Sequence, residues 1–227
     1  MGGGRELAVV LVSGGMDSAV VAALACRDHE AAFLHLDYGQ RTQERERRAF
    51  EAIADHFGVE RRLVTRVDPL GAVGGSSLTD PFMPISGARG GASAVPGTYV
   101  PFRNSHLLCA AVSWGEVLGA RWIYYGAVEE DSSGYPDCRE SYVAAFNELI
   151  RQGTRPETRL RVLAPLIHMS KAEIVREGMR LGAPFHLTWS CYGESEAACG
   201  ECESCLLRLR GFREAGFEDP IPYRRRT

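Results

Sequence analysis

The sequence predicts an α/β fold built on a doubly wound parallel sheet. Short apolar runs rich in β-branched residues alternate with amphipathic segments of helical length, which is the pattern of a parallel sheet covered by helices. A glycine-rich turn separates the first apolar run from the first helical segment. The 227 residues include 45% hydrophobic and 24% charged side chains, a balance that suits a globular domain with a full core.

Three buried strands are expected in the first third of the chain, at residues 7–12, 31–38 and 61–67, because each run is short, apolar and branched. A helix after the glycine turn joins the first two strands. A second helix, with Thr42 as its expected N-cap, joins the last two. Its apolar stripe repeats at helical spacing and ends before Gly58. The stripe consists of Phe50, Ile53, Ala54 and Phe57.

Regular patterning stops between residues 71 and 101. That segment holds seven glycines and four prolines, which interrupt both helices and strands. Loops of this length inside a compact domain are typically functional lids or disordered segments. We therefore expect residues 71–101 to form a flexible loop that covers the functional site as a lid.

Beyond this loop, a helix is expected at residues 107–117, a strand at 122–128, a helix from Glu140 and a last strand at 160–166. One face of the helix from Glu140 is expected to be buried. That face consists of Tyr142, Phe146, Leu149 and Ile150.

The last helix expected from the pattern begins at a capping box. Ser170 and Glu173 have the S-x-x-E spacing, and the helix ends at Gly182. The chain then becomes rich in cysteine, glycine and turn residues. We interpret residues 1–185 as the main domain and residues 186–227 as a small C-terminal subregion.

The hexamer SGGMDS, residues 13–18, indicates a phosphate site. Gly14 and Gly15 let the backbone curl so that several N–H groups converge at the positive end of the next helix. Ser13 and Ser18 add hydroxyl donors. Asp17 is expected to order the loop or to hold Mg²⁺. The lysine of a Walker loop is missing from this hexamer.

The missing charge is expected to come from Lys171. The chain has 26 basic residues, and Lys171 is the single lysine among them. It directly follows the predicted cap Ser170, so its ammonium would lie beside a helix N-terminus, where a compact point charge suits a phosphate. The candidate catalytic residues are therefore Ser13, Asp17, Ser18 and Lys171.

Four of the seven cysteines lie in a C-x7-C-x2-C-x2-C pattern. Four thiolates at this spacing favour a closed tetrahedral Zn²⁺ site, which would staple the subregion without activating water. An iron–sulfur cluster and free thiols are the alternatives. The proposed ligands are Cys191, Cys199, Cys202 and Cys205.

Two polar stretches are candidates for substrate contacts. One comes at the end of the glycine-rich loop 71–101, and the other follows the predicted strand at 122–128. Ligands of doubly wound sheets bind beyond the carboxyl ends of the strands, where these stretches are expected. Their side chains can hold a carboxylate or read a polar heterocycle. The candidates are Arg103, Asn104, Asp131, Tyr135, Asp137 and Arg139.

Composition also excludes some classes of protein. A net charge of −3 argues against a broad nucleic-acid surface, so direct tRNA binding is not expected. No apolar run is long enough to span a bilayer, and the first residues do not have the pattern of a signal peptide. Clustered cysteines with metal-ligand spacing favour a reducing, cytoplasmic setting.

These motifs together resemble a known family. SGGMDS is similar to the PP-loop of the N-type ATP pyrophosphatases, which have an adenine nucleotide alpha hydrolase-like fold. Further strings narrow the resemblance to the 7-cyano-7-deazaguanine synthase (QueC) family, and they run in order along nearly the whole chain. They are DYGQR (37–41), VPFRN (100–104), SGYPDCR (133–139), SKAEI (170–174), TWSCY (188–192), CGECESC (199–205) and GFREAG (211–216).

The resemblance implies that the protein converts 7-carboxy-7-deazaguanine, ammonia and ATP to 7-cyano-7-deazaguanine on the path to queuosine. It also implies structural zinc on the four cysteines, Mg²⁺ with the ATP, and a homodimer. The ATP-binding residues that it implies are Val12, Ser13, Gly14, Gly15, Met16, Asp17, Ser18, Ala19, Val20, Val21, Ala22 and Lys171.

The sequence departs from the family pattern at Thr42, where histidine is usual, and at Glu129–Glu130. These departures keep other readings open. A related enzyme could stop at the amide or join the activated acid to a different amine. A tRNA-modifying PP-loop enzyme would need a basic surface, and a zinc-stapled binding module would not need an intact phosphate loop.

Overall fold

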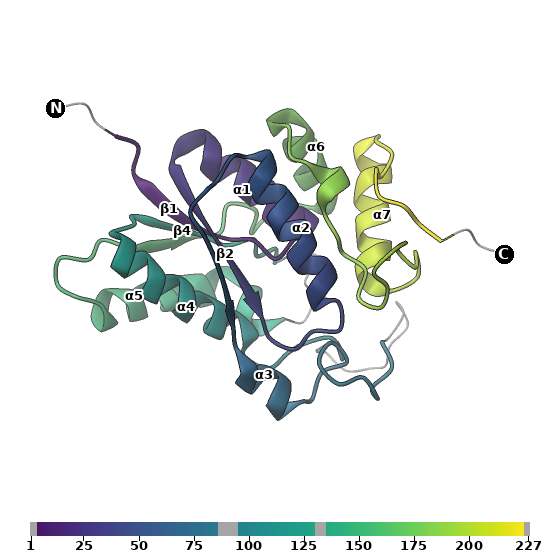
Figure 1. Cartoon of the computed structure of the whole chain (residues 1–227), viewed down its shortest axis with the longest axis horizontal. Helices are drawn as coiled ribbons and strands as arrows, with labels where there is room; N and C mark the ends of the chain where they lie inside the picture. Colours follow the sequence, from purple (N-terminus) through teal and green to yellow (C-terminus); the bar gives the residue numbers. More distant parts are fainter. Residues whose placement is uncertain (1–3, 86–94, 130–134, 225–227) are drawn as a thin grey trace.

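Five parallel strands form one sheet in the order β3-β2-β1-β4-β5 (Figure 1). The structure is a computed structural model that describes residues 4–85, 95–129 and 135–224. Every neighbouring pair of strands is parallel, which confirms the predicted fold class. The strands are β1 Leu7–Leu11, β2 Glu30–Asp37, β3 Arg62–Arg66, β4 Trp122–Tyr124 and β5 Arg161–Leu163.

Helices cover both faces of the sheet (Figure 1). One face packs against α1 Met16–Asp28, α2 Gln43–His56 and α6 Lys171–Leu181, and α7 Glu203–Ala215 packs against α6. The other face packs against α4 Arg103–Leu118 and α5 Glu140–Gly153. The short helix α3 Asp68–Val73 and the 3-10 turns Pro136–Cys138 and Phe185–Leu187 complete the described helices.

Strand β1 is apolar throughout because it lies in the middle of this sandwich. Ala8 and Val10 point into the core formed with α1 and α6, whereas Val9 and Leu11 point into the core formed with α4 and α5. A strand buried on both faces cannot show the alternation of a half-exposed strand. The sheet therefore carries the phosphate loop, which directly follows β1, on a fully buried support.

Strands β4 and β5 are shorter than the sequence predicted. Each has three residues, whereas a seven-residue strand was expected in each case. The backbone N–H of Tyr125 still donates to the carbonyl of Leu163, but the residues after Tyr125 line a cavity. Gly126 lies against the start of α1, since a Cβ there would be 3.5 Å from the Ser18 amide nitrogen. Those residues are apolar because they are buried, and not because they belong to a strand.

Thr42 is the N-cap residue of α2, as predicted, but its hydroxyl makes no capping bond and donates instead to Glu46 Oε1 at 2.7 Å. One prediction about a helix face was wrong. Leu149 was expected on the buried face of α5, yet it is 58% exposed. Only Phe146 and Ile150 of that stripe are fully buried, because the helix touches the sheet along a narrow line.

The expected loop at 71–101 begins with the last turn of α3. The Arg41 guanidinium donates to the carbonyl oxygens of Asp80 and Met83 and holds the next turns against the end of β2. The centre of the predicted lid, residues 86–94, lies outside the described residues. The lid therefore remains a prediction.

Helix α7 was missed by the sequence interpretation, which expected only turns after residue 186. Phe212 of α7 meets the ring of Phe185 edge-on, at 5.2 Å between centroids, and it belongs to the same core as α1 and α6. Arg208 is 1% exposed and makes two hydrogen bonds to Asp219, at 2.7 and 2.8 Å. Arginine is usually exposed, so the sequence gives no sign that Arg208 is buried. The buried face of α7 was therefore not recognised.

The contact between α6 and α1 gives a stability prediction. A Cβ at Gly178 would lie 2.3 Å from Phe185 Cζ and 2.7 Å from Val20 Cγ2, inside a packed core. We expect Gly178→Ala to lower the free energy of unfolding by about 1–3 kcal/mol, as overpacking does. Chemical denaturation measures it. Gly153→Ala is the control, because nothing lies within 4 Å of its added Cβ. Equal stability of both variants would contradict this packing.

Candidate active site

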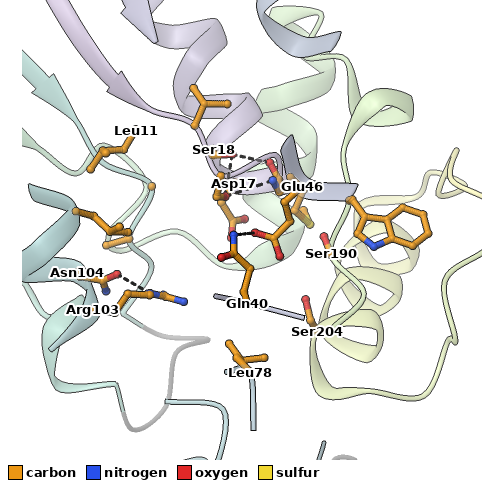
Figure 2. A pocket seen from close by; sticks show the side chains of 18 of the residues that line it. Leu11, Asp17, Ser18, Gln40, Glu46, Leu78, Arg103, Asn104, Ser190 and Ser204 are labelled. Atoms are coloured by element: carbon orange, nitrogen blue, oxygen red, sulfur yellow. Dashed lines mark hydrogen bonds between the residues drawn. The ribbon is translucent and has the colours of Figure 1, made fainter. Parts of the chain in front are cut away.

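A cavity of about 300 Å³ opens at the carboxyl ends of β1, β2 and β4 (Figure 2). This is the edge at which ligands of doubly wound sheets bind. The phosphate loop, the end of β2, the start of α4 and the start of α7 all contribute lining residues. Segments far apart in the sequence therefore meet around one space.

The phosphate loop is held in shape by its glycine and its serines. Gly14 has φ +88°, and a Cβ there would lie 2.6 Å from the carbonyl oxygen of Glu46, so a side chain has no room. Ser13 Oγ accepts from the Gly15 amide at 3.3 Å, and Ser18 Oγ donates to the Gly15 carbonyl at 2.9 Å. The loop leads into the N-terminus of α1, whose partial positive charge favours an anion in the cavity.

Lys171 lies beside this loop. Its Nζ donates to Asp17 Oδ2 at 2.9 Å, although the two residues are 154 positions apart. The predicted capping box is confirmed, because Ser170 and Glu173 satisfy each other's backbone N–H groups at the start of α6. Helix α7 presses on the same residue, since a Cβ at Gly211 would lie 2.7 Å from Lys171 Cβ. The ammonium is thus fixed at the phosphate end of the cavity.

Asp17 has one oxygen bound to Lys171, and its other oxygen, Oδ1, is buried with no hydrogen-bond partner among the described residues. A buried carboxylate oxygen that lacks a partner is costly unless a cation or a donor reaches it. This donor, at the mouth of a phosphate loop, fits a hard cation such as Mg²⁺.

Glu46 of α2 also lines the cavity, and the sequence interpretation treated it only as a first-turn acid. Burial raises the pKa of Glu46, and hydrogen bonds from Thr42 and from Gln40 partly oppose that rise. His35, at the end of β2, lies in the same wall, with its Nδ1 2.9 Å from the Val12 carbonyl oxygen. The T-x-x-x-E spacing of a helix turn was the signal for the Thr42–Glu46 pair.

Arg103 and Asn104, which were predicted as substrate contacts, both line the cavity. The Arg103 guanidinium lies over the ring of Tyr38, donates to its hydroxyl at 3.2 Å and donates to Asn104 Oδ1 at 3.3 Å. Burial alone would lower the pKa of Arg103, but Tyr38, Tyr125 and Asp137 raise it above the ordinary value. Arg103 therefore keeps its positive charge inside the site.

The other predicted substrate contacts have different places. Tyr135 lines the cavity and stacks on Tyr99, at 5.9 Å between ring centroids. Asp137 is buried behind the wall, where its Oδ2 accepts from the Asn104 amide at 3.1 Å, and it is not a lining residue. Arg139 is exposed at the start of α5 and also lies off the cavity. Asp131 lies outside the described residues.

The four predicted cysteine ligands come together. Their sulfur atoms all lie within 4.8 Å of one another, which suits a tetrahedral site with Zn–S bonds of about 2.3 Å. The backbone N–H groups of Glu201 and Cys202 donate to Cys199 Sγ at 3.4 and 3.3 Å, as in sites that hold thiolates. The cluster consists of Cys191, Cys199, Cys202 and Cys205, and it can hold a metal ion.

The segment that carries these cysteines also supports the phosphate loop. The Trp189 amide donates to the Gly14 carbonyl at 2.8 Å, and the Arg45 guanidinium lies 4.3 Å from the Trp189 ring centroid. Trp189 Nε1 donates to the Glu194 carbonyl at 2.9 Å. The cysteine cluster and the phosphate loop are therefore joined by a short stretch of chain.

Among the residues that the structure describes, no helix is long and apolar enough to cross a membrane.

The chain is similar to proteins of one family along its length. The family model described as "Queuosine biosynthesis protein QueC" matches residues 7–216. A protein from Chlorobaculum parvum is 55% identical over 217 residues, which are 95% of this chain and 96% of the relative. One from Acidobacterium capsulatum is 56% identical over 227 residues, 98% of each chain. Both are named "7-cyano-7-deazaguanine synthase".

The chain is also similar to solved structures at low sequence identity. The NMN synthetase of Francisella tularensis has a TM-score of 0.48 at 17% identity, over 84% of this chain and 68% of the other. The NAD⁺ synthetase of Burkholderia pseudomallei has a TM-score of 0.46 at 15% identity, over 90% and 66%.

Proposed function

The chain belongs to the queuosine biosynthesis QueC family, and we propose that it converts 7-carboxy-7-deazaguanine, ammonia and ATP to 7-cyano-7-deazaguanine. One observation carries the proposal. One cavity is lined by the phosphate loop, by Lys171, which is fixed by its ion pair with Asp17, and by Arg103. A nucleotide and an acid can therefore bind next to each other in it. The enzyme is thereby an ATP-dependent ligase that forms a carbon–nitrogen bond.

The first step activates the acid. A carboxylate oxygen of the substrate attacks the α-phosphorus of ATP, which forms an acyl-adenylate and releases pyrophosphate. The N–H groups of the phosphate loop, the hydroxyls of Ser13 and Ser18 and the ammonium of Lys171 stabilise the charge that develops on the leaving group. Arg103 holds the acid through its guanidinium, which is positively charged at neutral pH.

The second step forms the amide. Ammonia attacks the acyl carbon, AMP leaves, and one proton is released. The amide oxygen then attacks a second ATP at its α-phosphorus and releases a second pyrophosphate. Loss of AMP and of the remaining N–H protons leaves the nitrile. Each nitrile therefore uses two ATP molecules, and no covalent bond to the protein is needed.

Two cations fit the residues of this chain. Mg²⁺, held by Asp17 Oδ1, would neutralise phosphate charge. Zn²⁺ on the four cysteines would be coordinatively full, so its role is to fix the segment that carries Trp189. Ammonia as the nitrogen donor, a homodimer and a cytoplasmic location belong to the same proposal, and they are supported by the resemblance of the sequence to its family.

The product test is direct. Incubation with 7-carboxy-7-deazaguanine, ammonium, Mg²⁺ and ATP is expected to give the nitrile and two AMP per nitrile, measured by mass spectrometry. A reaction without ammonium is the control and is expected to give neither amide nor nitrile. Accumulation of the amide alone would overturn the proposal in favour of an enzyme that stops there. Release of AMP only with another amine or with tRNA would point to the other two alternatives.

A further inference from the structure

Glu203 places a carboxylate in the wall of the cavity, and nothing in the ATP chemistry uses it. It is the first residue of α7, and it lines the cavity together with Ser204 and Leu207. Its side chain is half-buried, and among the described residues none donates a hydrogen bond to it or pairs with it. A carboxylate repels both a phosphate and the reacting acid, so this wall suits a ligand with N–H donors.

The surroundings of Glu203 support such a ligand. Tyr135 and Tyr192 line the same part of the cavity. Burial raises the pKa of both hydroxyls, the negative charge of Glu203 raises it further, and the positive charge of Arg103 lowers it. The two opposite charges therefore act on one pair of tyrosines, and that part of the cavity has a positive side, a negative side and aromatic rings.

The carboxylate is also at the correct end of the cavity. In Figure 2, Asp17 and Ser18 lie at one end and Leu78 at the other, and Ser204 lies beside Gln40 between them, away from Asp17 and Ser18. Helix α7 passes Lys171 at Gly211, which is eight residues beyond Glu203 and so about 12 Å further along the helix axis. A bicyclic ring can lie between Glu203 and the phosphates, with its acid group directed at the reacting nucleotide.

We propose that Glu203 is a specificity-determining residue that accepts hydrogen bonds from the ring N1–H and the exocyclic 2-amino group of the 7-deazaguanine substrate. This inference rests on the proposed function. The two N–H groups lie side by side on one ring edge, and the two oxygens of a carboxylate match such an edge with charge-assisted hydrogen bonds. A ring without the 2-amino group offers only one of the two donors.

The metal cluster would hold Glu203 in place for this task. Cys202 and Cys205 stand on either side of it in the chain, and both belong to the cysteine cluster. A residue fixed at both ends by metal ligands loses little freedom when it binds a substrate, which improves discrimination. The cluster would thus support the phosphate loop through Trp189 and the base-reading wall through Glu203.

The experiment compares Glu203→Gln and Glu203→Ala with Glu201→Gln. Glu201 is the matched control, because it is exposed, lies between two cysteines of the same cluster, Cys199 and Cys202, and does not line the cavity. Calorimetry measures the Kd for 7-carboxy-7-deazaguanine and for its analogue without the 2-amino group. Both Glu203 variants are expected to raise the Kd and the KM for the acid about ten- to a hundredfold. Their ATP affinity and zinc content are expected to stay at the wild-type values, and kcat is expected to change much less than KM.

The analogue gives the sharper result. The wild-type protein and Glu201→Gln are expected to prefer the complete ring by about tenfold or more, and Glu203→Ala is expected to lose most of that preference. The ratio of two affinities measured on one protein does not depend on how much of it is folded. If Glu203→Ala keeps the wild-type preference, the inference is overturned while the proposed function stands. If the wild-type protein neither binds nor converts the acid, the proposed function fails first, before any variant is compared.

Discussion

Replacing Lys171 by alanine is expected to lower kcat by about a hundred- to a thousandfold, which is the usual cost of removing one donor that stabilises charge in a transition state. The substitution removes the one ammonium at the phosphate end, and it leaves the partly buried carboxylate of Asp17 without its ion pair. That carboxylate would then repel the leaving pyrophosphate. The measurement is the rate of AMP release at saturating ATP and acid.

Two further variants make this result specific. Lys171→Arg is expected to restore little activity, because the guanidinium is longer and wider than the ammonium, which already lies 2.9 Å from Asp17 Oδ2. Arg180→Ala removes an exposed charge from the same helix and is expected to leave kcat unchanged. Full activity of Lys171→Ala with an unchanged melting temperature would remove Lys171 from the mechanism.

Cys205→Ser is expected to have the largest effect on stability. Cys205 is fully buried in the cysteine cluster, and the binding free energy of a structural zinc site is on the order of 10 kcal/mol or more, which rivals the stability of a whole domain. We expect loss of bound zinc, a lower melting temperature and weaker ATP binding. ATP binding weakens because Trp189, in the same segment, holds Gly14 of the phosphate loop.

Elemental analysis and thermal melts measure these effects, and the exposed Cys109 supplies the control variant Cys109→Ser. The control is expected to retain one zinc per chain and the wild-type melting temperature. A Cys205→Ser protein that also retains both would show that the cluster is no structural zinc site. A brown chromophore with bound iron in the wild-type protein would favour the iron–sulfur alternative.

The features predicted best from the sequence are those that depend only on residues close together in the chain. The glycine turn at 13–18, the capping box at Ser170 and the cysteine spacing each depend on a few neighbouring residues, and the structure confirms the turn before α1, the cap of α6 and the clustering of the sulfurs. The closeness of Asp17 and Lys171 could be predicted, because the glycine turn and a lysine at a helix N-terminus both suit a bound phosphate. These parts of the site follow from short-range rules.

Other features depend on packing between distant elements, and the sequence did not reveal them. Glu46 and Glu203 look like ordinary helix-start acids until α2 and α7 turn them toward the cavity. Asp137 looked like a ligand contact, but its position behind the wall follows from the turn of the chain before α5. Arg208 can be buried because Asp219, the carbonyl of Phe185 and the hydroxyls of Thr188 and Ser190 accept its hydrogen bonds.

The contacts of the phosphate loop also bear on protein synthesis. The loop leaves the ribosome before its lysine, which is made 154 residues after Asp17, and Trp189 follows later still. At roughly 5–20 residues per second, the delay is about 10–30 s. During that time the phosphate loop of the nascent chain lacks its contacts with Lys171 and Trp189. ATP can therefore stabilise the protein only after the cysteine-bearing segment has been translated.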